Sequence, residues 1–179
     1  MNQHDMTRNM VLAALFAALT AIGAFLQIPT GTVPITLQFL FTALAGLLLG
    51  WKWGAISQLL YVGIGLLGLP VFTQGGGIGY VLQPSFGFLL GLIPAAAVIG
   101  AMTARRTGYL TVLAAVLVGD LILYAVGVPY MYLILHVYMQ STKTFPALLA
   151  AMLVYVPGDT LKIVVVTALA PVLRRTLAK

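Results

Sequence analysis

The sequence contains no cysteine, which excludes disulfide bonds, thiolate metal sites and cysteine nucleophiles. Charged residues are almost as scarce, because they make up 7% of the 179 residues, whereas a soluble domain usually carries ~25%. So few charges could not cover the surface of a soluble globule, and 61% of the chain is hydrophobic. The composition therefore predicts an integral membrane protein that lies in the lipid bilayer of the cell membrane.

Patterns typical of enzymes are also missing. The two histidines and three acidic residues are too few for a metal-ligand set, and no Walker A lysine motif is present, so the chain is not expected to hydrolyse ATP. Ser57 and Ser85 lack a Gly-x-Ser-x-Gly context, which leaves a small membrane hydrolase dependent on an unsupported pairing with His136. We expect no enzyme activity and no cofactor.

Six apolar runs are separated by turn signals and basic residues. The first, from Met10 to Ile28, would reach ~28 Å at ~1.5 Å per residue, close to the ~30 Å hydrocarbon thickness. Gly127-Val128-Pro129 is expected to break the fifth helix, and the aromatic segment 129–140 to lie along an interface. We therefore predict an all-α, six-helix transmembrane bundle formed by a single domain, 1–179. The expected spans are residues 10–28, 35–50, 54–69, 85–103, 109–126 and 145–173.

The basic residues give this bundle a direction. If the N-terminus is inside, seven of them lie on the cytoplasmic side, only Lys143 lies outside, and Lys162 lies within the membrane. The seven are Arg8, Lys52, Arg105, Arg106, Arg174, Arg175 and Lys179. The positive-inside rule then places both termini in the cytoplasm and the loops 29–34 and 70–84 outside. Scattered basic residues of this kind anchor a membrane protein, and we expect no nucleic-acid partner.

The last apolar run contains an acid and a base three residues apart, which places Asp159 and Lys162 on one helix face. At ~1.5 Å per residue they lie ~22 and ~18 Å from the cytoplasmic interface, in the outer part of the membrane. Asp120 reaches a similar depth. Charges at such depth indicate a functional site, although Asp159 and Lys162 could instead be a structural ion pair. For Asp120 we expect a structural role, as partner of a tyrosine or of Lys162.

The loop 70–84 has four glycines and no charge. A loop this apolar is expected to fold over a site, with Phe72, Gln74 and Tyr80 as contacts. The alternative is a plain glycine-rich connector.

The first helix carries small residues four apart, at Ala13/Ala17 and at Ala14/Ala18. Such faces allow close helix approach. Taken alone, they indicate internal packing more often than a partner site.

Several segments together resemble the BioY family, the biotin-specific S components of energy-coupling factor (ECF) transporters. The resemblance covers nearly the whole chain and ends at Pro157-Gly158-Asp159-Thr160-Leu161-Lys162. The other segments are 33–38, 46–50, 57–61, 68–72 with the glycine run that follows, and 127–130. The resemblance implies a bundle that holds biotin near the outer face and docks, through Ala13 and Ala17, on a transmembrane coupling subunit that works with two cytoplasmic ATPases.

The resemblance also places Asp159 and Lys162 on the family's ligand-contacting acid and lysine. An aspartate can accept the ureido N–H bonds of biotin, and a lysine can pair with its ureido oxygen or its carboxylate. Gln38 and Gln74 can bond either group, while Phe72 and Tyr80 can cover the ring. Alternatives are an S component for thiamine or riboflavin, a stand-alone biotin facilitator, and a purely structural membrane subunit.

Overall fold

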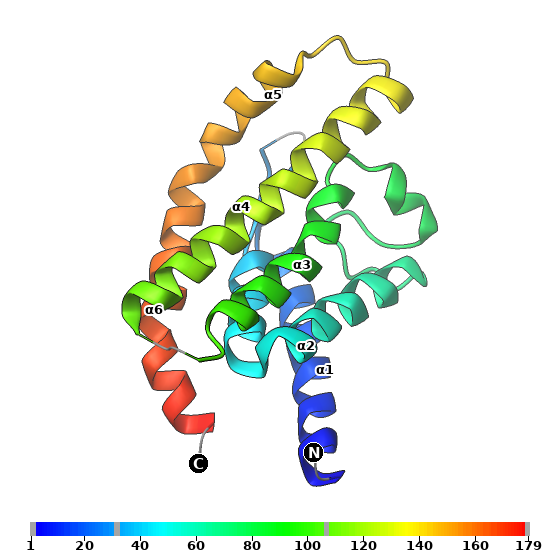
Figure 1. The fold of residues 1–179 in the computed structure, drawn as a ribbon. Coiled ribbons are helices and arrows are strands. Elements are labelled where there is room, and N and C mark those ends of the chain that lie inside the picture. The colour runs from blue at the N-terminus through cyan, green and yellow to red at the C-terminus, as the bar shows by residue number, and fades with distance from the viewer. Residues whose placement is uncertain (1–2, 31–32, 106–107, 178–179) are drawn as a thin grey trace.

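The computed structural model describes residues 3–30, 33–105 and 108–177, and these residues are mainly helical (Figure 1). Two short strands, β1 (Gln27–Ile28) and β2 (Ile35–Thr36), pair antiparallel between the first two helices. The helices are α1 (Gln3–Phe25), α2 (Gln38–Leu66), α3 (Phe86–Met102), α4 (Tyr109–Leu133), α5 (Phe145–Met152) and α6 (Val156–Leu177). Two short 3₁₀ helices, η1 (Ile78–Leu82) and η3 (Leu153–Tyr155), and a short π-helix, η2 (Ile134–Tyr138), complete the described elements.

The predicted all-α membrane character is confirmed, but the count of six spans is not. Within the described residues, four helical stretches are long and apolar enough to cross a membrane: 3–25, 38–66, 109–138 and 145–173. The shorter apolar helix α3 occupies the predicted span 85–103. The predicted spans 35–50 and 54–69 overlap the two parts of α2 before and after Gly50, and each extends three residues beyond its ends.

Helix α2 folds back on itself at Gly50, whose φ of 78° and ψ of 179° are not helical. A Cβ built on Gly54 would lie 2.8 Å from the Cα of Gly46, although residues eight apart in a straight helix are ~12 Å apart. Glycine adopts a positive φ without a steric penalty, which lets the chain reverse here. The two halves of α2 therefore pack against each other, and Figure 1 shows the change of direction.

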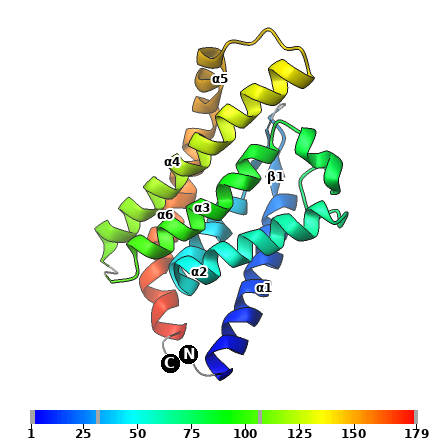
Figure 2. The same ribbon diagram turned by 45° about the vertical axis from the view of Figure 1, so that its right-hand side comes forward.

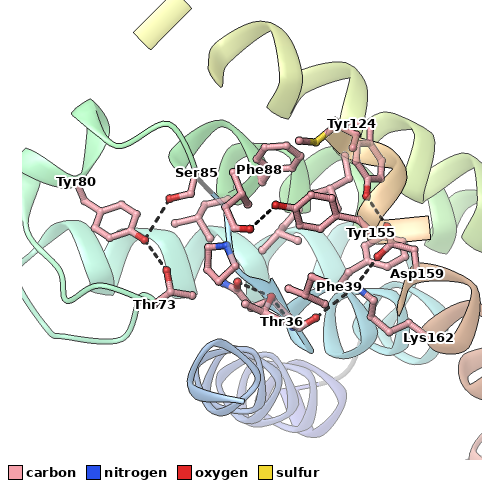
Figure 3. Close-up of a pocket in the computed structure, with 18 residues that line it drawn as sticks. Thr36, Phe39, Thr73, Tyr80, Ser85, Phe88, Tyr124, Tyr155, Asp159 and Lys162 are labelled. Carbon is pink, nitrogen blue, oxygen red and sulfur yellow. Dashed lines mark hydrogen bonds and ion pairs between the residues drawn. The ribbon is translucent and has the colours of Figure 1, made fainter. Parts of the chain in front are cut away.

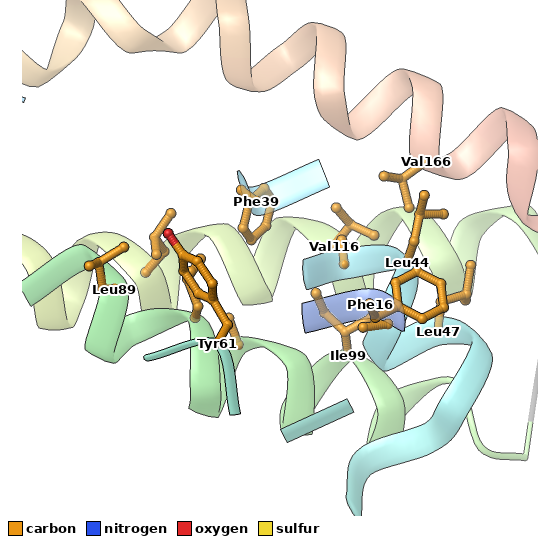
Figure 4. Packing of buried hydrophobic residues seen from close by; sticks show 14 of the residues in the cluster. Phe16, Phe39, Leu44, Leu47, Tyr61, Leu89, Ile99, Val116 and Val166 are labelled. Carbon is orange, nitrogen blue, oxygen red and sulfur yellow. The ribbon is translucent and has the colours of Figure 1, made fainter. Parts of the chain in front are cut away.

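Small residues let α3 pack directly on the backbone of α2. A Cβ on Gly46 would lie 2.4 Å from the carbonyl oxygen of Ala96, and one on Gly100 would lie 2.3 Å from the amide nitrogen of Trp51. Around these contacts, side chains from five helices form one apolar core (Figure 4). Members from α1, α2, α3, α4 and α6 are Phe16, Leu44, Ile99, Val116 and Val166.

The predicted helix break at 127–129 is wrong, because α4 continues through Pro129 to Leu133 and then into η2. A proline within a membrane helix is tolerated where neighbours satisfy the freed backbone groups. Gly127 serves packing instead, since a Cβ there would lie 2.4 Å from the ring of Phe88. The segment 129–140 is accordingly the end of a span rather than a separate interfacial helix.

The described ends of α1 and α6 lie together at one end of the bundle, and the loops after α1 and α2 lie toward the other (Figures 1 and 2). This arrangement is compatible with both termini on one side of a membrane. The described residues leave out four of the basic positions that predict this orientation. They are Arg106, Lys179 and the side chains of Arg174 and Arg175. The cytoplasmic placement of the termini therefore stays a prediction.

Candidate functional site

The last span changes its helical geometry just before its two charges. After α5, the turn η3 leads into α6 at Val156, immediately before Pro157 and Gly158. Pro157 lies in the first turn of α6, where its missing amide hydrogen costs no bond within the helix. Asp159 and Lys162 follow in the first two turns of α6 and are 6% and 7% exposed. Their carboxylate Oδ1 and ammonium Nζ lie 2.5 Å apart, so the predicted common face is confirmed.

Two other elements hold this buried pair. The hydroxyl of Tyr124 on α4 donates to the second carboxylate oxygen of Asp159. The ammonium of Lys162 also donates to the backbone carbonyl of Thr36 on β2, at 3.3 Å. Figure 3 shows this chain of contacts from Tyr124 to Thr36. Each charge thus has an additional hydrogen-bond partner, as buried charges require.

The pair lines a cavity bounded by β2, α2, α3, α4 and α6, with about 620 Å³ of space, its open mouth included. Its middle is apolar. The apolar side chains that line it include Phe39, Phe88, Leu89, Leu92, Leu123 and Met152.

A second, uncharged polar group lies at the opposite end of the cavity. The hydroxyl of Tyr80 is 2.9 Å from Thr73 Oγ1 and 3.4 Å from Ser85 Oγ. All three residues line the cavity. Figure 3 shows this cluster of three hydroxyls on one side, the Asp159–Lys162 pair on the other and Phe88 between them. The cavity therefore suits a ligand that is polar at both ends and apolar in the middle.

The loop 70–84 packs on this site through only some of its predicted contacts. Tyr80 lines the cavity, whereas Phe72 is 1% exposed and lies behind it. The Phe72 ring centroid is 5.5 Å from that of Tyr61 and 4.6 Å from that of Tyr80, so it supports Tyr80 from the core. Gln74 is exposed and does not line the cavity. The loop is thus packed against the bundle rather than being a plain connector.

Gln38 lines the cavity, but its amide group is already bonded on both sides. Its oxygen accepts from Thr36 Oγ1 at 2.9 Å, and its nitrogen donates to the hydroxyl of Tyr61 at 2.7 Å. That hydroxyl donates in turn to the carbonyl of Val71 at 3.1 Å. Gln38 therefore connects β2 to the loop 70–84 and fixes the position of Thr36 beside Lys162.

Several residues of the site were not predicted. Tyr155 precedes Asp159 by four residues and Lys162 by seven, so helical spacing places it on the same face and could have revealed it. Its hydroxyl donates to the carbonyl of Val33. Tyr124 follows Asp120 by four residues and so lies on the same face of α4, but only the packing of α4 on α6 brings it to Asp159. The other cavity residues without a prediction include Thr36, Thr73 and Phe88.

The structure also places three other residues differently from the sequence expectation. Ala13 and Ala17, expected on a docking face, are 0% and 5% exposed and lie inside the bundle. The neighbouring pair Ala14 and Ala18 is exposed instead, because successive residues differ by ~100° around a helix. Asp120 was expected to be the partner of a tyrosine or of Lys162, but Tyr124 and Lys162 both contact Asp159 instead.

Comparisons with known proteins agree with this arrangement. The sequence profile of the BioY family matches residues 1–179. The chain is 53% identical over 147 residues to a probable biotin transporter BioY of Lysinibacillus sphaericus, covering 81% of this chain and 75% of that protein. It is 35% identical over 164 residues to the biotin transporter BioY of Thermotoga maritima, covering 91% and 94%.

A solved structure has the same fold. The crystal structure at 2.1 Å of the S-component for biotin from an ECF-type ABC transporter aligns with a TM-score of 0.86 and 29% identity. The alignment covers 98% of this chain and 95% of that one. With the apolar spans, these matches identify a multi-pass membrane protein of a transporter family rather than an enzyme. The chain belongs to the BioY family.

Proposed function

We propose that this protein is a biotin-binding S component that captures biotin in the cavity beside Asp159 and Lys162. The observation that carries the proposal is the distribution of polar groups, with an ion pair at one end of the cavity, hydroxyls at the other and apolar side chains between. Biotin has the same sequence of groups: a ureido ring, an apolar ring and chain, and a carboxylate. The relatives named as biotin transporters support this assignment.

The buried pair suits recognition of the polar groups of biotin. The carboxylate of Asp159 can accept ureido N–H bonds, and the ammonium of Lys162 can donate to the ureido oxygen or to the carboxylate. The hydroxyls of Tyr80, Thr73 and Ser85 can bond the opposite end of the ligand. Charge-assisted hydrogen bonds are stronger than neutral ones, so the ion pair is expected to contribute most of the polar binding energy.

The same proposal includes partners that supply energy. The chain has no Walker A motif of its own, and the matched S-component comes from an ECF-type ABC transporter. We therefore propose a complex with a transmembrane coupling subunit and two cytoplasmic ATPase subunits. The excess of basic residues on the side of the termini supports a cytoplasmic placement for both ends and an outward-facing cavity in the cell membrane.

Thermal stability of the purified protein in detergent tests the ligand. Biotin is expected to raise the melting temperature, because a ligand at a hundred times its Kd stabilises the folded state by ~2.7 kcal/mol. Thiamine and riboflavin are expected to leave it unchanged. A shift with either of these vitamins and none with biotin would overturn the proposal. Biotin uptake by vesicles that contain this chain alone would instead favour a stand-alone facilitator.

Docking on the coupling subunit is expected to use the exposed Ala14/Ala18 face of α1, where small side chains permit close helix approach. Changing both alanines to tryptophan should reduce co-purification with the coupling complex while leaving biotin binding intact. Leu121→Trp, an equally bulky change at a residue 68% exposed on α4, is the matched control. Equal recovery of the complex with the Ala14/Ala18 variant and the control would contradict this docking face.

A further inference from the structure

Asp120 on α4 has a buried carboxylate oxygen that the binding site, as described so far, does not use. Among the residues that the structure describes, its Oδ1 is the one buried side-chain oxygen or nitrogen without a hydrogen-bond partner. Leaving such an oxygen unpaired costs free energy, more for a charged group than for a neutral one. Nearly all buried polar groups are paired, so this exception requires a physical explanation.

The packing of α4 on α6 places Asp120 at the level of Lys162. The two helices run in opposite directions (Figure 1), and the bond from Tyr124 to Asp159 sets their register. One turn back along α4 leads from Tyr124 to Asp120, and about one turn forward along α6 leads from Asp159 to Lys162. Asp120 is accordingly within electrostatic range of both Asp159 and Lys162.

The cluster therefore contains two carboxyl groups, those of Asp120 and Asp159, and the ammonium group of Lys162. In the ligand-free structure, the ammonium of Lys162 lies 2.5 Å from Oδ1 of Asp159, while Tyr124 donates to Oδ2. Each oxygen of Asp159 thus already has one partner before any ligand arrives, and each keeps a further lone pair that can accept a bond. Asp120 has no such contact to its Oδ1.

Ligand binding must disturb this pair, a step that rests on the proposed function. A ureido group that donates to Asp159 competes with Lys162 for the negative charge of that carboxylate. In this orientation the ammonium of Lys162, a residue that is 7% exposed, keeps only a weakened contact with its counter-ion. A buried ammonium group with a weakened counter-ion contact is costly.

We infer that Asp120 is a positioning residue for ligand binding, which accepts the ammonium of Lys162 when the ligand engages Asp159. Lysine is suited to this exchange because its charge sits at the end of a flexible four-carbon chain with three donors. Asp120 acts through Lys162 and does not touch the ligand. In this arrangement, the unpaired oxygen of the ligand-free state becomes paired in the bound state.

Asp120→Asn removes the charge and keeps the shape of the side chain. It is expected to weaken biotin binding roughly tenfold, the equivalent of ~1.4 kcal/mol, without lowering the melting temperature of the ligand-free protein. Asp120→Glu, which keeps a carboxylate, should recover most of the affinity. Asp5→Asn, at an exposed acid in the first turn of α1, is the matched control and should bind as the wild type does.

A merely structural Asp120 would give a different pattern. Asp120→Asn would then lower ligand-free stability, or leave biotin affinity at the wild-type value, and either result overturns the inference. Absence of biotin binding by the wild type would instead contradict the proposed function itself, so the two failures are distinguishable.

Infrared difference spectra between biotin-saturated and biotin-free protein provide a second measurement that does not depend on the size of the affinity change. The wild type should show a change in a carboxylate stretching band that is lost in Asp120→Asn and shifted in Asp120→Glu. The shift in Asp120→Glu keeps the test valid if Asp120→Asn does not fold. Bands that are the same in the wild type and both variants would overturn the inference.

Discussion

Replacing Asp159 with asparagine is expected to weaken biotin binding on the order of a hundredfold or more. Truncating one partner of a buried, hydrogen-bonded charge pair costs ~2–5 kcal/mol or more, because the other charge is left buried and unpaired. Here Asp159→Asn would remove the negative charge 2.5 Å from the ammonium of Lys162 and leave one oxygen where Lys162 and Tyr124 now bond two. Lys162→Ala should have a loss of the same order, since it leaves Asp159 unpaired.

Isothermal titration of purified variants with biotin measures this effect. Thr160→Ala is the matched control, since Thr160 lies next to Asp159 but is exposed and bonds the carbonyl of Val156 in its own helix, at 2.7 Å. Its affinity should equal that of the wild type. Wild-type affinity in both Asp159→Asn and Lys162→Ala would exclude the pair from the binding site.

The second large effect is expected for stability rather than binding. Gly46→Val should lower the free energy of unfolding by about 3 kcal/mol, the upper end of the usual range for overpacked cores. The new Cβ would lie 2.4 Å from the carbonyl oxygen of Ala96. That oxygen belongs to the backbone of α3 and cannot turn aside as a side chain can, so the two helices would have to separate.

Unfolding by heat or denaturant in the same detergent measures this loss. Gly63→Val is the matched control, because Gly63 is also in α2 but has no atom within 4 Å of a Cβ built on it. It should change stability only by the small difference in helix propensity between the two residue types, which favours valine. Equal losses in the two variants would show that close packing of α2 on α3 does not limit stability.

The sequence by itself determined those features that depend on composition and on spacing along one helix. The scarcity of charged residues predicts a membrane protein. A separation of three residues places Asp159 and Lys162 on one helix face whatever surrounds them. The same spacing includes Tyr155, which was overlooked although the signal was present. Local geometry of this kind is independent of the partner helix, which is why these predictions agree with the structure.

Only the tertiary structure decided which neighbour each of these faces meets. Repeated alanines predict a close helix contact, but the rotation of α1 in the bundle buries Ala13 and Ala17 and exposes Ala14 and Ala18. Gly127 predicts a helix break from the sequence, whereas in the structure it lies within the helix and contacts the ring of Phe88. The register of α4 on α6 brings Tyr124 to Asp159 and leaves Asp120 unpaired beside them. These outcomes depend on contacts between residues far apart in the chain, and residue type and spacing within one helix carry no information about such contacts.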